Sequence, residues 1–122
     1  MPRLIPPPSH WLAALNTVFS EDVSGVRIVE HSLYARCHGP ICATTRPEKI
    51  LLCGSAESFF ADAELVLHEY FHVVRQWRTG ELTRFGYLRE CARQGYWNNR
   101  FEVAARDFAS SELLRCRALL AT

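Results

Sequence analysis

The sequence predicts an α+β domain in which a small sheet of about three to four strands precedes a helical half. Two observations carry this prediction. Between residues 25 and 53 the chain holds short apolar runs separated by proline-containing turns, a pattern typical of strands. After Gly54 the apolar residues recur at helical spacing up to residue 120. Strands grouped before helices, rather than alternating with them, are typical of α+β folds.

The first part of the chain is expected to be an extended, proline-rich segment followed by a helix. Residues 1–8 read MPRLIPPP, and consecutive prolines hold φ and lack the N–H group that a helix needs. The stretch HWLAALNTVFS, residues 10–20, carries apolar side chains at helical intervals, and Ser9 before it can cap a helix. Because 122 residues leave little room for two cores, we expect one domain over residues 9–122.

The remaining elements follow from apolar periodicity. Strands are expected at 25–31, 33–37, 41–45 and 49–53. Residues 58–77 read as one long helix, apolar around most of its circumference and therefore buried. Further helices are expected at 81–94 and 98–120.

Composition restricts the classes of partner. The net charge is +1 with 22% charged residues, which creates little long-range attraction for nucleic acid or membrane. Asp62 and Glu64 interrupt the longest apolar stretch, so no membrane span is expected. Six arginines fall between residues 75 and 100, and we expect a solvated face or a partner surface rather than a nucleic-acid site, because Glu81 and Glu90 interrupt them.

The cysteines favour a reducing compartment. The chain has five, without a C-x-x-C pair, and its start lacks the apolar run of a secretory signal. We therefore expect a cytoplasmic location, with export left open. A second metal site at Cys37, His38, Cys42 and Cys53 is the less favoured interpretation, because the spacing fits no standard zinc pattern.

The stretch LVLHEYFHVVRQW at residues 65–77 carries the chemistry. His68 and His72 are four residues apart, so on a helix they share one face about 5–6 Å from each other and can bind one metal ion. Glu69 lies about 100° around the helix, where it can act as a general base on a metal-bound water.

An alternative is that these are ordinary core histidines. The neighbours of the motif are apolar, however, and no basic residue is nearer in sequence than Arg75. A buried carboxylate without a cation costs several kcal/mol. A divalent ion among the three groups removes that cost, so the metal site is the favoured hypothesis.

A catalytic zinc has three protein ligands and one open position. No histidine follows His72, so a downstream third ligand must be acidic. The candidates are Glu81, Glu90, Glu102, Asp107 and Glu112. Glu102 is favoured because apolar residues surround it, and small alanines at 104 and 105 allow close helix packing. The alternative for Glu102 is a capping box opened by Asn99.

The motif at 68–72, followed by E-x-x-A-x-x-F-A at 102–109, resembles small zinc metallopeptidases of the gluzincin type. It is similar to ImmA/IrrE-type and other minimal gluzincin domains, and to uncharacterised bacterial domains that read H-E-x-x-H-V-x-x-Q. The resemblance covers residues 41 to 109. It implies that His68, His72 and Glu102 bind zinc and that Glu69 is the general base and acid. It further implies that Ile41–Thr45 is an edge strand that pairs antiparallel with an extended peptide substrate.

Two positions depart from this pattern. Many gluzincins carry an aspartate four residues after the glutamate ligand, where this chain has Arg106 with Asp107 next to it. Arg100 replaces the usual proline before the glutamate helix.

The resemblance leads to the hypothesis of a zinc metallopeptidase. For the oxyanion that forms during peptide hydrolysis we expect Tyr96 as the donor, with Tyr87 and Tyr70 as rivals. The alternative function is a metal-binding, peptidase-like module that serves in a larger assembly with little or no turnover. Substrate, cleavage preference and oligomeric state are not predicted.

Overall fold

The computed structural model describes residues 2–32 and 43–122 and confirms the α+β class. The elements run in the order β1 (Arg3–Ile5), α1 (Ser9–Phe19), β2 (Arg27–Glu30), β3 (Ala43–Arg46), β4 (Lys49–Leu52), α3 (Ala56–Phe60), α4 (Ala63–Phe71), the π-helical segment η1 (His72–Trp77), α5 (Arg84–Asn98) and α6 (Arg100–Leu120).

The sheet has four strands in the order β1-β2-β4-β3. β2 and β4 are parallel, and the two outer strands are antiparallel to their neighbours. β3 therefore lies at an edge of the sheet, as expected for Ala43–Thr45; Ile41 and Cys42 lie outside the described residues, as does the strand expected at 33–37. The opposite edge is β1, which places part of the proline-rich start inside the sheet.

Glu30 explains how the start of the chain joins the sheet. Its Oε1 accepts a hydrogen bond from Nε of Arg3 at 3.1 Å, and its Oε2 accepts one from the backbone N–H of Ala56 at 2.8 Å. One buried carboxylate thus connects β1, β2 and the first turn of α3. Ile5 opposite Ile28 adds an apolar pair on the inner face.

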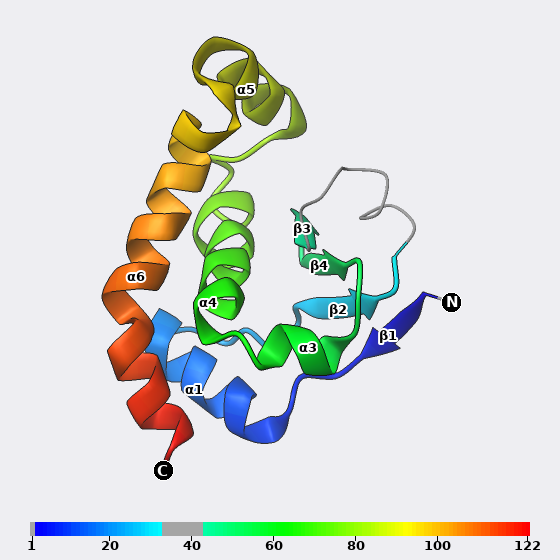
Figure 1. Ribbon diagram of the computed structural model, residues 1–122, viewed down its shortest axis with the longest axis vertical. Coiled ribbons are helices and arrows are strands. Elements are labelled where there is room, and N and C mark those ends of the chain that lie inside the picture. Colours follow the sequence, from blue (N-terminus) through cyan, green and yellow to red (C-terminus); the bar gives the residue numbers. More distant parts are fainter. Residues whose placement is uncertain (1, 33–42) are drawn as a thin grey trace.

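Helix α4 is the centre of the molecule. Figure 1 shows it between the sheet and the long helix α6. Helix α1 packs against the C-terminal part of α6. This position explains why α4 and η1 are apolar on several sides: Val66, Leu67, Tyr70, Val73 and Val74 are at most 1% exposed. A helix covered by neighbours on opposite sides must be apolar on both.

The prediction of one continuous helix over residues 58–77 was wrong, because the chain forms α3, α4 and η1 in this range. α3 ends at Phe60, and the side chain of Asp62 accepts a hydrogen bond from the N–H of Leu65 at 3.1 Å, which caps a new helix. An aspartate that bonds a nearby N–H competes with continuation of the helix. From His72 the helix widens into η1, where the N–H of Arg78 bonds the carbonyl of Val73 at 3.0 Å.

The helix expected at 81–94 begins later, at Arg84, and its regular part ends at Gly95 as expected, after which α5 continues to Asn98. The Oγ1 of Thr83 accepts from the N–H of Gly86 at 2.9 Å and starts α5 at Arg84. Gly95 interrupts α5 with a positive φ of 80°, a conformation that glycine adopts without a steric cost. Asn99 then caps α6, its Oδ1 accepting from the N–H of Phe101 at 2.8 Å.

Helix α5 is peripheral. None of its residues is buried, and it contacts mainly α6, at the top of the view in Figure 1. It exposes Phe85, Leu88, Tyr96 and Trp97. Within the described part of the chain, no helix combines the length and apolar character needed to cross a membrane.

Candidate metal centre

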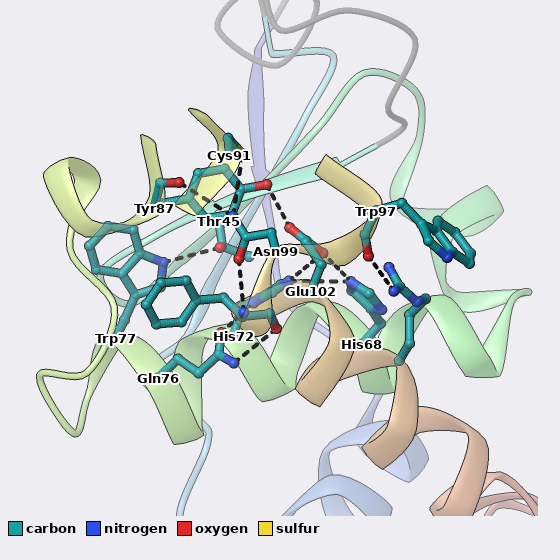
Figure 2. A network of polar contacts seen from close by, with 12 residues as sticks. Thr45, His68, His72, Gln76, Trp77, Tyr87, Cys91, Trp97, Asn99 and Glu102 are labelled. Atoms are coloured by element: carbon teal, nitrogen blue, oxygen red, sulfur yellow. Dashed lines mark hydrogen bonds and ion pairs between the residues drawn. The ribbon is translucent and has the colours of Figure 1, made fainter. Parts of the chain in front are cut away.

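Side chains from two helices meet at one point, as Figure 2 shows. The Nε2 atoms of His68 and His72 lie 2.9 Å and 3.1 Å from the same oxygen of Glu102, Oε1, and 3.2 Å from each other. Their ligand atoms all lie within 4.8 Å of one another, so this group could hold a metal ion. The predicted convergence of these residues is therefore observed.

The shape of the donor triangle fits a metal ion. A divalent ion with tetrahedral nitrogen and oxygen ligands at about 2.0–2.1 Å places those ligands about 3.3 Å apart. The three edges here measure 2.9, 3.1 and 3.2 Å, so little movement is needed for all three atoms to contact one ion.

The other acidic candidates do not join this group. Glu81 and Asp107 are exposed. Glu90 lies 3.8 Å from Arg100, and Glu112 lies 3.1 Å from Arg115. Surface ion pairs of this kind account for these residues without a metal.

The close approach of α4 and α6 follows from small residues on α6. Ala105 and Ala109 are at most 1% exposed, and each removes the side-chain bulk that would separate the helices. The expectation for Ala104 was wrong, because that residue is exposed. The spacing of four between the two buried alanines places both on the face that also carries Glu102.

Tyr87 holds the other oxygen of Glu102. Its hydroxyl donates to Oε2 at 2.7 Å, leaving Oε1 for the histidines. Burial alone would raise the pKa of Glu102, but hydrogen bonds from His68, His72 and Tyr87 hold it well below its usual range. The carboxylate is therefore ionised, as a metal ligand must be.

Gln76 determines the orientation of His72. Its amide nitrogen donates to the carbonyl of Phe101 at 3.0 Å, so its oxygen, Oε1, faces Nδ1 of His72 at 2.6 Å. Nδ1 must then carry the proton that it donates. In neutral His72 the lone pair on Nε2 consequently points at Oε1 of Glu102.

Two lone pairs at 3.1 Å repel each other unless a positive charge lies between them. That charge is either a second proton on His72 or a metal ion shared with Glu102. Burial lowers the pKa of His72, while the carboxylates of Glu102 and Glu69 raise it more. The same electrostatic attraction applies to any cation at this point, a metal ion included.

Gln76, and not the residue at position 106, bonds the second ring nitrogen of His72. Arg106, which stands in that position, points away from the centre: it donates to the carbonyl of Trp97, and its guanidinium lies 3.7 Å over the Trp97 ring. Sequence reasoning did not identify Gln76. The available signal was its position four residues after His72, on the same helix face.

A cleft opens beside the centre. Its lining residues are Ala43, Thr44, Thr45, Arg46, Glu69, His72, Trp77, Leu82, Arg84, Tyr87, Leu88, Tyr96 and Glu102, around a volume of about 150 Å³. β3 forms one wall, α5 forms the other, and the ligand helices form the floor. The metal centre is thus reachable from the edge of the sheet.

Glu69 lies in this cleft and is only 5% exposed. Burial raises its pKa to about 7, against the opposing effect of His72 and His68. A carboxylate with a pKa near neutrality can both accept and release a proton at physiological pH, which general acid–base chemistry requires.

The three tyrosines considered as oxyanion donors occupy different places. Tyr70 is fully buried in the core and does not line the cleft. The hydroxyl of Tyr87 already donates its hydrogen bond to Glu102. Tyr96 lines the cleft and is 42% exposed; burial, and then the charges of Glu102 and Glu69, raise its pKa to about 12. A protonated hydroxyl therefore stands beside the centre, and its role stays a prediction.

Two further predictions concern the cysteines and the arginines. Cys53 is half-buried, whereas Cys37, His38 and Cys42 lie outside the described residues. Arg75 donates to the carbonyl of Phe19, and Arg78 pairs with Glu48 and Glu21. These two arginines hold the fold together and are not part of a free basic surface.

Comparison with models of known protein families, with curated proteins and with solved structures finds no match.

Proposed function

We propose that this protein is a zinc-dependent metallopeptidase that hydrolyses peptide bonds within the cleft between β3 and α5. One observation supports the proposal: His68, His72 and Glu102 form a group that could hold a metal ion, and two of its members, His72 and Glu102, line this cleft together with the buried carboxylate of Glu69. Ligands, base and an edge strand thus meet in one place.

The donor set supports zinc. Two histidine nitrogens and one carboxylate oxygen are the ligands of many catalytic zinc sites, which keep a further position open. A zinc ion bound here would acidify a water molecule and polarise the carbonyl of a peptide bond. Gln76, on Nδ1 of His72, supplies the outer hydrogen bond that such ligands require.

Glu69 is proposed to move the proton. It accepts a proton as water attacks the peptide carbonyl and delivers it to the leaving amine. The hydroxyl of Tyr96 is proposed to donate a hydrogen bond to the oxyanion that develops on the carbonyl.

The edge strand is proposed to hold the substrate. In the described part of the sheet β3 pairs only with β4, so its other side can pair with an extended peptide. Trp77 donates to Oγ1 of Thr45 at 3.1 Å and holds β3 against η1. This contact keeps the strand at a constant distance from the metal centre.

Glu69→Gln tests the assignment. The variant keeps the size and hydrogen bonding of the side chain but cannot accept the proton. Zinc-loaded wild-type protein should cleave peptides in a library detected by mass spectrometry, and the variant should bind zinc equally while cleaving at least about 100-fold more slowly. Chelator-sensitive cleavage that survives in the variant would contradict the role of Glu69.

A metal-binding module without turnover is the second candidate. The exposed apolar side chains of Phe85, Leu88 and Trp97 on α5 favour it, at 77%, 65% and 66% exposure, because such groups gather at interfaces between proteins. Tight zinc binding without cleavage of any peptide in the library would favour this candidate.

A further inference from the structure

Two arginines line the cleft from opposite walls, Arg46 at the end of the wall formed by β3. Arg46 is the last residue of β3, and Arg84 is the first residue of α5; both line the cleft. The guanidinium of Arg46 lies 5.7 Å from the centroid of the Trp77 ring, which keeps it at this end. In the described part of the chain, neither arginine has a carboxylate within salt-bridge distance.

Among the described residues, no carboxylate outside the metal centre lines the cleft. Its lining contains two carboxylates, Glu69 and Glu102, and both belong to the metal centre. The positive region continues beyond the cleft across the sheet, where Arg46 is directly opposite Lys49 and Lys49 is opposite Arg27. Like charges in directly opposed positions destabilise a sheet, and an anionic ligand relieves that repulsion.

The position of these arginines relative to the metal centre follows from the helix. Trp77 contacts Thr45 and Arg46 and lies five residues after His72 at the end of the π-helical segment η1, so it is little more than one helical turn, on the order of 5–7 Å along the axis, from this residue of the metal centre. An extended peptide advances about 3.3 Å per residue. About two to three substrate residues therefore separate the scissile bond from the Arg46 end of the cleft.

From this arrangement we infer that the substrate carries an acidic side chain two or three residues before the scissile bond, bound between Arg46 and Arg84. A peptide antiparallel to β3 enters with its N-terminal half beside Arg46, because Arg46 is the C-terminal residue of the strand. The inference rests on the proposed peptidase function and names the substrate class for that same cleft.

The test is a set of peptides that differ at one position. A single glutamate is moved from four residues before the scissile bond to four residues after it, and glutamine replaces it in matched controls. With zinc-loaded wild-type protein, kcat/KM should be roughly tenfold higher for glutamate than for glutamine at the second or third preceding position. Equal values there, with cleavage intact, would overturn this inference and leave the peptidase function standing.

Charge reversal identifies the two residues. Arg84→Glu and Arg46→Glu should each remove the preference for glutamate and favour lysine at the same peptide position. Arg89→Glu is the matched control, because Arg89 is exposed on α5 outside the cleft; it should keep the wild-type preference. A preference unchanged in both cleft variants would overturn the assignment.

A measurement of peptide binding tests this inference independently of catalysis. Fluorescence anisotropy with zinc-loaded Glu69→Gln protein measures the same peptides without turnover. Tighter binding of the glutamate peptide than of its glutamine control, lost in the Arg84→Glu background, supports the inference even if the wild type cleaves nothing. Equal affinities for the two peptides overturn it, and no binding of any peptide contradicts both the inference and the proposed function.

Discussion

Oε1 of Gln76 accepts a hydrogen bond from Nδ1 of His72 at 2.6 Å, and this contact decides which nitrogen of the ring faces Glu102. Because Gln76 also donates to the carbonyl of Phe101, one amide connects the first ligand helix to the residue before the third ligand. Gln76 is therefore a positioning residue: it sets the tautomer of His72 and fixes the distance between η1 and α6.

Gln76→Leu should lower metal affinity about 10–100-fold, the usual effect of losing an outer hydrogen bond to a ligating histidine. Gln76→Glu should restore most of the affinity, because a carboxylate also accepts from Nδ1. Competition with a chromogenic chelator measures the affinity, and long-range ¹H–¹⁵N correlation spectra report the tautomer of His72. Gln94→Leu, at an exposed position of α5, is the control. A wild-type tautomer in Gln76→Leu would contradict the positioning role.

Glu102→Ala should abolish stoichiometric metal binding, and His72→Ala should do the same. Each removes one of three ligand atoms that lie within 4.8 Å of one another, and two remaining ligands bind a divalent ion far more weakly. Metal analysis after gel filtration measures the stoichiometry. Glu112→Ala, which removes a carboxylate paired with Arg115 at the surface, should retain full metal. Full occupancy in Glu102→Ala would exclude Glu102 as a ligand.

Tyr87→Phe should weaken metal binding, whereas Tyr96→Phe should slow turnover. The Tyr87 hydroxyl bonds Oε2 of Glu102 at 2.7 Å, and a hydrogen bond to a charged group contributes about 1.5–3 kcal/mol. Its loss should weaken metal binding roughly tenfold or more. Tyr96→Phe should leave metal affinity unchanged and lower kcat, measured by peptide cleavage. Unchanged turnover in an active Tyr96→Phe preparation would remove Tyr96 from the mechanism.

Stability should fall in acid partly through Glu30. The backbone N–H of Ala56, and then Arg3, lower its pKa below the ordinary value of 4.5 in the folded protein. A carboxyl whose folded pKa is depressed stabilises the fold above its unfolded pKa, and this contribution is lost as the pH falls through the folded pKa.

Glu30→Gln should therefore melt at a lower temperature than the wild type at pH 7, and the difference should shrink as the pH falls below about 4.5. Thermal unfolding followed by circular dichroism between pH 7 and pH 3 measures this. Glu57→Gln, at an exposed position of α3, is the control. A difference between Glu30→Gln and the wild type that stays constant with pH would contradict the assignment.

Local patterns explain which features could be read from the sequence. The spacing of His68 and His72 defines a shared helix face, and the apolar surroundings of Glu102 mark a buried carboxylate; both required only knowledge of helical geometry. The break in the helix at Asp62 was not predicted, because an aspartate can lie within a helix or cap the start of a new one. Which of the two occurs depends on the packing around α3 and α4.

The sequence by itself determined the α+β order of the elements and which side chains could hold a metal ion, because periodicity and residue chemistry are local properties. Only the tertiary structure decided that Gln76 bonds Nδ1 of His72, that Tyr87 bonds Glu102, and that Arg46 and Arg84 line the same cleft. These relations join residues from different elements, and the packing of α4 between the sheet and α6 sets the distances between them.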